Sequence, residues 1–157
     1  MPFNHTHDYV TEHPHHTASI EITAATSSLA EMRSFVEHFL LQAGVNGPTI
    51  RDVVLSADEA CANLINHAFL GDDTQTIQIT VCVSKMEISI EISDSARPFD
   101  PATVLSPNMD AYFAERRVGG LGITLMRQLM DTVTYTPATD STSYNTLVLT
   151  KRHSSAL

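Results

Sequence analysis

Five segments of the chain alternate between apolar and polar residues, and three longer segments repeat their apolar residues with a helical period. Alternation predicts half-buried strands, and the helical period predicts amphipathic helices. The predicted strands cover residues 18–23, 77–83, 88–92, 132–136 and 144–150. The predicted helices cover residues 28–43, 49–69 and 121–131. This order predicts an α+β sandwich of two layers, with the helices on one face of a mixed, mainly antiparallel sheet.

Local signals mark where these elements begin and end. Ser28 and Glu31 have the spacing of a capping box, which predicts that a helix begins at Ser28. Gly44 is expected to end that helix as its C′ residue. The sequence Asn-Gly-Pro at 46–48 predicts a turn, and a tight turn near Lys85 is expected to join two strands into a hairpin.

The polar face of the second helix is the first candidate for chemistry. Its members are Asp52, Ser56, Glu59, Asn63, Asn66 and His67. An ordinary solvated face is the alternative, but Asn costs about half a kcal/mol relative to Ala inside a helix. An Asn oxygen can complete an octahedral Mg²⁺ site, and a Glu one turn away can accept a proton from a hydroxyl or water.

Two further features suit a nucleotide, although each also has a purely structural reading. The sequence Gly-Gly-Leu-Gly at 119–122 opens the third helix, where exposed N–H groups attract phosphate, but it also suits a tight turn. Asp94 follows the strand at 88–92, where its carboxylate can form a turn or accept a hydrogen bond from an amine such as that of adenine. The irregular segment 94–118, with three prolines, is predicted to be a functional lid.

Composition narrows the class of protein. The 157 residues suffice for one domain with a real core. The net charge of −9 argues against nucleic acid or an anionic membrane reached by charge alone. The first twenty residues contain no signal-peptide-like apolar run, and no stretch reaches the ~18–20 apolar residues that span a bilayer. Cys61 and Cys82 lack metal-site spacing and are expected to be buried, reduced thiols of a cytoplasmic protein.

Residues 1–17 differ from the rest of the chain because they show no period and hold five of the eight histidines. A metal site is one interpretation of His5, His7, His13, His15 and His16. Nothing in the sequence would fix its geometry, so a flexible, solvated tail is predicted instead. The folded domain is predicted to cover residues 18–153.

Three segments occur in the order and spacing of a known ATP-binding fold. They are S-A-D-E-A-C-A-N-L-I-N-H-A-F at 56–69, D-S-A-R-P-F-D-P at 94–101 and G-G-L-G-I-T-L-M-R-Q-L-M-D at 119–131. Together they resemble the GHKL, or Bergerat, ATPases, and more closely the anti-sigma-factor serine/threonine kinases. The resemblance covers most of residues 18–152 and implies a histidine-kinase-like ATPase domain that binds ATP and Mg²⁺.

The resemblance also implies roles for particular residues. Glu59 matches the general base and Asn63 the Mg²⁺ ligand, which places both on one helix. Asp94 matches the residue that recognises the adenine amino group. Gly120 and Gly122 match the glycines that border the lid and the phosphates.

Four more residues are weaker candidates by the same resemblance. His67, Arg117 and Thr124 match positions that contact phosphate, and Thr146 on the last strand is a candidate on the adenine side. The segment 100–118 corresponds to the ATP lid, which is short, as in the kinase subfamily.

One residue departs from the family pattern. Ala96 stands where the family often has Gly, two residues after the adenine-binding Asp. Its methyl group would crowd the base if the backbone needed a positive φ, and would be tolerated at a negative φ. The departure therefore bears on ATP affinity more than on the fold.

The resemblance further implies a serine kinase of a partner switch. Such a protein phosphorylates a serine or threonine of a STAS-type anti-sigma-factor antagonist, binds a sigma factor and forms a homodimer. One alternative is a non-catalytic module, a pseudo-kinase that binds nucleotide or protein and sequesters a partner. Another is the detached catalytic domain of a histidine kinase, which should carry a phospho-accepting helical dimer domain; the sequence shows no such segment.

Overall fold

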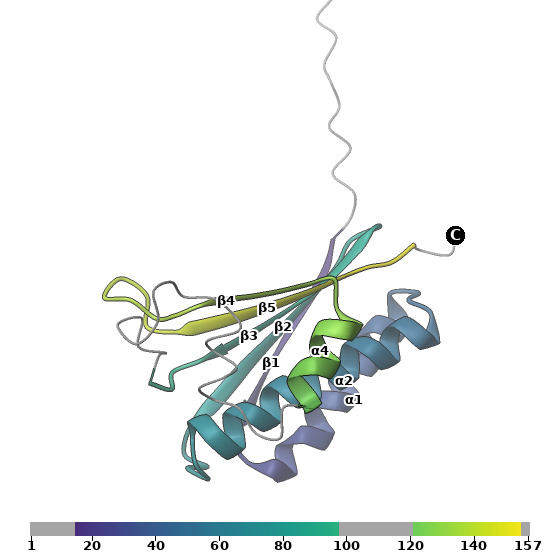
Figure 1. Ribbon diagram of the computed structural model, residues 1–157. Coiled ribbons are helices and arrows are strands. Elements are labelled where there is room, and N and C mark those ends of the chain that lie inside the picture. The colour runs from purple at the N-terminus through teal and green to yellow at the C-terminus, as the bar shows by residue number, and fades with distance from the viewer. Residues whose placement is uncertain (1–14, 98–120, 155–157) are drawn as a thin grey trace, which may run out of the picture.

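The computed structural model describes residues 15–97 and 121–154, and Figure 1 shows them as a sheet with helices on one side. The strands are β1 (His16–Thr23), β2 (Thr76–Val83), β3 (Glu87–Asp94), β4 (Thr132–Thr136) and β5 (Asn145–Arg152). The helices are α1 (Leu29–Gln42), α2 (Gly47–Asn63) and α4 (Leu121–Leu129), with a 3-10 turn η1 (Thr26–Ser28) and a π-helical turn η2 (Leu64–Ala68). The predicted α+β class is confirmed.

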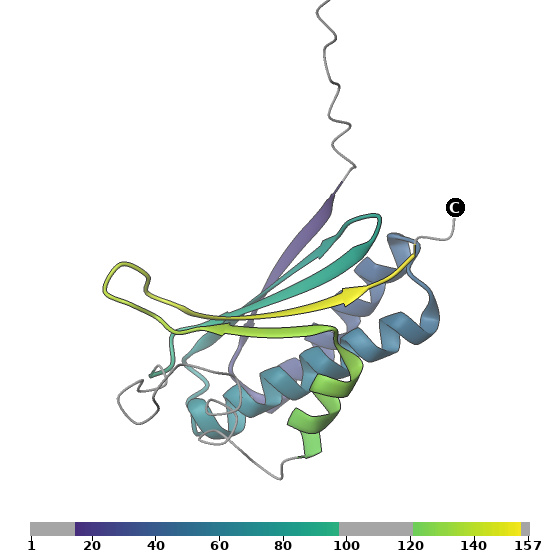
Figure 2. The same cartoon turned by 45° about the horizontal axis from the view of Figure 1, so that its top comes forward.

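The five strands form one sheet in the order β1-β2-β3-β5-β4, and every neighbouring pair is antiparallel. β2 and β3 form the predicted hairpin. One row of Cα partners crosses the whole sheet and consists of Ile20, Ile79, Ile92, Leu147 and Tyr135. These residues belong to the hydrophobic core or pack against it, so the row faces the helices that lie below the sheet in Figure 2.

The helices complete this core with one apolar stripe each. The fully buried residues of α1 include Met32, Val36 and Leu40, and those of α2 include Val53, Ala57 and Cys61. Both sets follow the helical period that predicted the helices. A fully buried aliphatic side chain contributes about 1.5–3 kcal/mol, so the contact between sheet and helices is the main source of stability.

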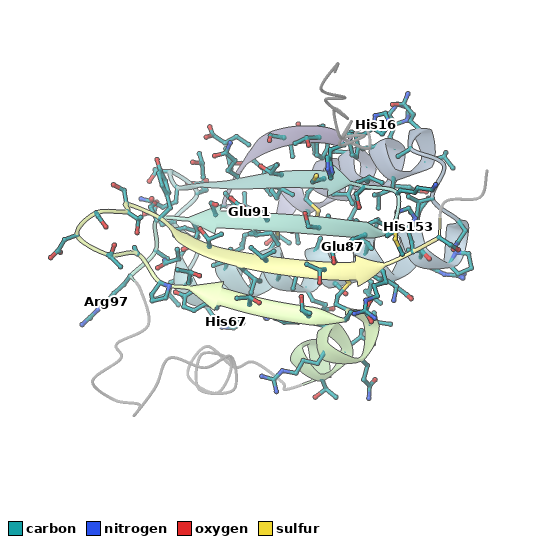
Figure 3. All side chains as sticks on the ribbon, turned by 90° about the horizontal axis from the view of Figure 1, so that it is seen from above. His16, His67, Glu87, Glu91, Arg97 and His153 are labelled. Carbon is teal, nitrogen blue, oxygen red and sulfur yellow. The ribbon has the colours of Figure 1, made fainter. Side chains whose placement is uncertain are left out.

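The opposite face of the sheet is polar, and no helix of the described part covers it. Figure 3 views this face, with Glu91 of β3 labelled. The hydroxyl oxygens of Ser19 and Thr80 lie 2.8 Å apart on it. Cys82 lies on the same face and is half-buried, so the prediction of a buried thiol holds for Cys61 but is wrong for Cys82.

The starts of the helices differ from the predictions. Ser28 is already in the helical conformation as part of η1 and makes no capping bond, and its hydroxyl lies 2.7 Å from that of Thr23. The predicted capping box at Ser28 and Glu31 is therefore wrong, because a cap needs an extended backbone. The predicted turn at 46–48 is also wrong: Asn46 caps α2, and its Oδ1 accepts from the Thr49 N–H at 2.9 Å.

The end of α1 is as predicted. Gly44 has a φ of +79°, which only glycine adopts at little cost. The N–H of Gly44 donates to the Leu41 carbonyl and the N–H of Val45 to the Leu40 carbonyl, both at 3.1 Å. This pair of bonds is the Schellman motif, which satisfies the last carbonyls of the helix.

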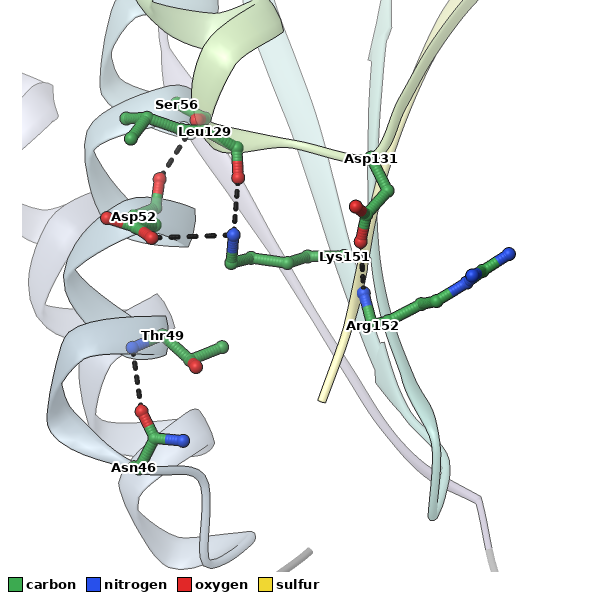
Figure 4. Close-up of polar contacts among 8 residues, drawn as sticks. All are labelled: Asn46, Thr49, Asp52, Ser56, Leu129, Asp131, Lys151 and Arg152. Atoms are coloured by element: carbon green, nitrogen blue, oxygen red, sulfur yellow. Dashed lines mark hydrogen bonds and ion pairs between the residues drawn. The ribbon is translucent and has the colours of Figure 1, made fainter. Parts of the chain in front are cut away.

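The C-terminal end of α4 is fastened to both β5 and α2 (Figure 4). Lys151 Nζ donates to the Leu129 carbonyl at 2.5 Å and lies 3.4 Å from the Asp52 carboxylate. The Arg152 N–H donates to the Asp131 carboxylate at 2.6 Å. These contacts fix the position of α4 beside α2.

Within residues 15–97 and 121–154, no helix is long and apolar enough to cross a membrane, and no group of three or more His, Cys, Asp or Glu could hold a metal ion. Residues 1–14 of the predicted tail lie outside the described residues. His15 and His16 are exposed, and His16 begins β1, two residues before its predicted start.

Candidate functional site

Two polar residues continue an apolar row at one end of the sheet. Ile22, Ile77, Asp94 and Asn145 are Cα partners in turn across four strands. Ile22 and Ile77 are buried in the core, and the next two positions are equally enclosed: Asp94 is 4% exposed and Asn145 is 0% exposed. Buried polar groups are costly unless they are hydrogen-bonded, so this pair marks a site with a built polar network.

The network joins three segments of the chain. Asp94 Oδ1 accepts from the Ala96 N–H at 2.9 Å and from Asn145 Nδ2 at 3.0 Å. Asn145 Nδ2 also donates to the Ala96 carbonyl at 2.8 Å, and its Oδ1 accepts from the Ala138 N–H at 2.9 Å. The end of β3, the turn after it and the connection between β4 and β5 are thereby held together. We call Asp94, Ala96, Ala138 and Asn145 the base-end network, because the family resemblance implies that Asp94 recognises the adenine base.

Ala96 fits this network without backbone strain. It is 8% exposed. Among the described residues, Leu70 alone has a positive φ without being glycine, so Ala96 keeps a negative φ. The condition under which an alanine is tolerated here is met in this structure.

The middle of α2 lies beside the base-end network. Burial, and after it the charges of Asp58 and Asp94, raise the pKa of the Cys61 thiol to about 12. α2 also contacts β3, the strand that ends at Asp94. The helix that carries Glu59 and Asn63 therefore runs past the base-end network.

The polar face of α2 looks toward α4. At about 100° per residue, Asp52, Ser56, Glu59 and Asn63 fall within an arc of about 60°. α2 contacts α4, and Asp52 lies near the Lys151 ammonium that reaches the end of α4. Glu59 and Asn63 are half-buried, so they line the open part of this flank.

Ser56 lies on this polar face, as the helical period predicts, but it is neither solvated nor open to a ligand. It is 0% exposed, and its hydroxyl donates to the Asp52 carbonyl at 2.9 Å. The contact of α2 with α4 covers this part of the face. The Ser56 hydroxyl therefore forms a hydrogen bond within α2 and does not face a ligand.

The helix widens immediately after Asn63. Residues Leu64–Ala68 form a π-helical turn, and the Phe69 N–H donates to the Leu64 carbonyl at 2.8 Å. Such turns are rare and frequent at functional sites. The turn carries His67, which is half-buried, so its position relative to Asn63 is not that of a continuous α-helix.

The remaining candidates fall into two groups. Arg117, Gly120 and the predicted lid at 100–118 lie outside the described residues. Gly122 lies in the first turn of α4, and Thr124 is exposed on the same helix.

The structure does not bring Thr146 to this group. Asn145, Leu147 and Leu149 are buried toward the helices, and side chains alternate along a strand. Thr146 pairs with Ser93 and therefore lies on the opposite, polar face of the sheet.

Asn145 is the site residue that the sequence interpretation missed. The signal was present, because Asn145 is in phase with Leu147 and Leu149 in the predicted strand at 144–150. An amide at a position reserved for core residues indicates either a strand end or a buried hydrogen-bond network. The structure shows both.

A groove of about 650 Å³ lies elsewhere, between α1 and α2. Its lining includes Leu41, Leu55 and the ion pair of Arg33 with Asp58, whose atoms are 2.7 Å apart. Around α2, Asp58 lies about 100° from Glu59 and about 140° from Asn63, whereas Leu55 lies only about 40° from Glu59. The groove is distinguished from the candidate site by its lining, which includes none of Glu59, Asn63, Asp94 and Asn145.

The chain is similar to known proteins over most of its length. It is 28% identical over 119 residues to the serine/threonine-protein kinase BtrW of Bordetella bronchiseptica, a match that covers 76% of this chain and 84% of that protein. It is 28% identical over 123 residues to the serine-protein kinase RsbW of Listeria monocytogenes, covering 76% of this chain and 78% of the relative.

Its fold resembles a solved structure of the RsbU and RsbW domains of Rv1364c from Mycobacterium tuberculosis, with a TM-score of 0.60. That likeness has 15% sequence identity and covers 87% of this chain and 32% of the longer one, so it concerns the fold alone. The family model of the histidine kinase-like ATPase domain matches residues 22–151. The resemblance inferred from the three motifs is confirmed, and the chain belongs to the histidine kinase-like ATPase domain family.

Proposed function

We propose that the chain is an ATP- and Mg²⁺-binding regulatory kinase that phosphorylates a serine or threonine of a protein partner. One observation carries the proposal: a buried carboxylate, Asp94, lies at the end of β3, a strand that contacts the helix bearing Glu59 and Asn63. Membership of the ATPase domain family and relatives named serine-protein kinases support the same reading.

The residues present suit the proposed ligand. The Asp94 carboxylate is a hydrogen-bond acceptor whose orientation the base-end network fixes, which suits the exocyclic amine of adenine. Asn63 offers an amide oxygen of the kind that binds Mg²⁺ together with phosphates and waters. The glycine-rich start of α4, with Gly122, would present backbone N–H groups to the phosphates.

The proposed chemistry is mostly positioning. Bound Mg²⁺ would neutralise charge on the phosphates. Glu59 lies one helical turn from Asn63 and is half-buried, so its carboxylate can accept the proton of the attacking serine hydroxyl. Asn63 would hold the metal side of the nucleotide and Asp94 the base, which leaves the terminal phosphate at the Glu59 side of the helix.

The proposed partners follow from the kinase subfamily that the motifs resemble. The substrate would be a STAS-type antagonist of an anti-sigma factor, and the chain would restrain a sigma factor when that antagonist is phosphorylated. Nucleotide state and competition between partners would decide which complex forms. A homodimer and a cytoplasmic location are part of the same proposal.

The direct test is phosphoryl transfer from labelled ATP with Mg²⁺ to an antagonist encoded beside the protein. The wild type should label the antagonist, and Glu59→Ala should not. Absence of transfer by the wild type, or full transfer by Glu59→Ala, would refute the kinase mechanism. Glu91→Ala, on the exposed outer face of β3, is a matched control that should transfer normally.

A second candidate is a non-catalytic binding module. The negative φ of Ala96 removes the backbone argument for this candidate, which then depends only on the buried methyl group of Ala96 at the base end. In that case the chain would sequester a partner without using ATP. Calorimetric titration with ATP and with ADP separates the two candidates, since absent binding of both would favour the module. Ala96→Gly should then restore binding if the methyl group is the obstacle.

A further inference from the structure

We propose that Asn145 is a positioning residue that sets the base selectivity of the site, through its hold on Asp94 and on the Ala96 turn. The inference rests on the proposed function, since it concerns recognition of adenine by Asp94. It goes further because the resemblance gave the adenine-side role on this strand to Thr146 and none to Asn145. Asn145 and Asp94 are Cα partners on adjacent strands, which places the two side chains together on the helix-facing side of the sheet.

The orientation of the Asn145 amide is determined by its partners. Its Nδ2 group donates to two acceptors, Asp94 Oδ1 at 3.0 Å and the Ala96 carbonyl at 2.8 Å. Its Oδ1 accepts from a backbone donor, the Ala138 N–H, at 2.9 Å. If the amide oxygen and nitrogen exchanged places, the nitrogen would face the Ala138 N–H and the oxygen would face the Asp94 and Ala96 oxygens, so these hydrogen bonds could not form. The amide therefore has one arrangement in which every bond is made.

That arrangement also determines the carboxylate. Asp94 Oδ1 receives two donors, one from Asn145 and one from the Ala96 backbone. Two bonds to a single oxygen at 2.9 and 3.0 Å fix both the tilt and the rotation of the carboxylate plane. The Ala96 carbonyl, held by the same amide, keeps the following turn against the strand end.

Selectivity follows from a fixed, buried acceptor. Adenine presents an amine donor at its position 6, whereas hypoxanthine presents a carbonyl acceptor there. A site built to hydrogen-bond one group rejects the analogue that cannot make the bond, because the buried polar group is left unpaired. A carboxylate that can turn or take up water loses this discrimination. The base preference should therefore depend on Asn145 although Asn145 itself need not touch the base.

The test measures the ratio of affinities for ATP and inosine triphosphate, both with Mg²⁺, by calorimetry. The wild type should prefer ATP by roughly 100-fold or more. Asn145→Ala should reduce the preference to about tenfold or less, chiefly by weakening ATP binding. A merely structural role would weaken both ligands alike and leave the ratio unchanged, so the ratio separates positioning from stability.

Two further variants keep the test decisive. Asn145→Asp preserves the volume of the side chain but removes both amide donors, and it should lower the ratio as Asn145→Ala does, which covers the case that the alanine variant fails to fold. Thr146→Ala, on the opposite face of the sheet, should keep the wild-type ratio.

The outcomes distinguish the two proposals. A wild type that binds neither triphosphate would overturn the proposed function and this inference with it. A wild type that selects ATP, with the same ratio in folded Asn145→Ala and Asn145→Asp, would overturn the inference alone. A collapsed ratio in both variants and an unchanged ratio in Thr146→Ala is the result that the geometry predicts.

Discussion

The two ends of the candidate site are built in opposite ways. At the base end, Asp94 and Asn145 are buried, and four hydrogen bonds of 2.8–3.0 Å hold the network. At the other end, Glu59, Asn63 and His67 are half-buried on α2 and η2. In the described part of the chain, those three side chains make no hydrogen bond to one another. We call these three residues the phosphate end.

The difference separates two kinds of preorganisation. The base end is completed by the fold itself, so its geometry is formed before any ligand arrives and its residues also stabilise the domain. The phosphate end lies on α2 and η2, and under the proposed function its half-buried side chains would be completed by the ligand. Substitutions at the base end should therefore change stability and binding together, whereas those at the phosphate end should change activity with little effect on folding.

Glu59→Gln should have the largest effect. Removal of the proposed base should lower phosphoryl transfer by roughly 10²–10⁴-fold, while ATP affinity and the melting temperature stay close to those of the wild type. Single-turnover transfer to the protein substrate, with calorimetry and thermal melting, checks all three quantities. Equal losses of transfer and ATP affinity would contradict the proposal that Glu59 acts as the base and not in ATP binding.

Asn63→Ala should have the next largest effect, on the Mg²⁺ dependence of ATP binding. Loss of the amide ligand should reduce the gain in ATP affinity that Mg²⁺ confers by about tenfold or more. Titrations with and without Mg²⁺ measure that gain. Asn66→Ala is the matched control, because Asn66 is exposed on the adjoining π-helical turn η2 and should leave the gain intact.

Unlike the substitutions at Glu59 and Asn63, Asn145→Ala should destabilise the domain. The Ala138 N–H, the Ala96 carbonyl and Asp94 would each lose a buried partner, which costs about 1–3 kcal/mol in the free energy of unfolding. Urea unfolding measures this loss. Thr146→Ala should change the free energy by no more than about 0.5 kcal/mol. Equal free energies of unfolding for Asn145→Ala and Thr146→Ala would contradict the claim that the base end stabilises the domain.

Cys61 gives the smallest predicted effect, through the pH dependence of stability. The buried thiol has a pKa raised from 9.0 to about 12, so above pH 9 the unfolded chain loses this proton while the folded chain keeps it. The unfolded state binds fewer protons in that window, and the free energy of unfolding therefore falls as the pH rises from 9 toward 12.

The measurement is urea unfolding at pH 8 and pH 10. The wild type and Cys82→Ala should lose about 1 kcal/mol more than Cys61→Ala between these two values, because only Cys61→Ala lacks the buried thiol. The comparison uses the change with pH, so the packing defect left by Cys61→Ala does not enter. An identical change in all three proteins would show that Cys61 does not stay protonated in the folded state.

The sequence predicted the elements well and their ends less well. Strong alternation, as at residues 77–83, places a strand and its buried face at once because the period is two. Ser28 shows the limit of a capping motif: its spacing to Glu31 is right, but η1 already puts its backbone in the helical region. Asn46 shows the converse, since Asn-Gly-Pro reads as a turn and equally as an N-cap followed by the first helical turn.

The site residues likewise divide into those that a local motif identifies and those that depend on distant parts of the chain. Glu59, Asn63 and Asp94 could be named as candidates because each lies in a local motif, and the sequence pattern predicted nearly all of α2 and β3. Asn145 could not be assigned, because two of its three partners, Ala96 and Asp94, are 49 and 51 positions away along the chain. The burial of Ser56 was missed for a related reason, since no local pattern tells which part of a polar face is covered.

The central claim is that one nucleotide joins the two ends of the site. A crystal structure with Mg²⁺ and a non-hydrolysable ATP analogue tests it most directly. We predict that the adenine amine lies about 3 Å from the Asp94 carboxylate and that the Asn63 amide oxygen lies about 2.1 Å from Mg²⁺. A nucleotide bound instead in the groove between α1 and α2, or bound with Asn63 away from the metal, would contradict it.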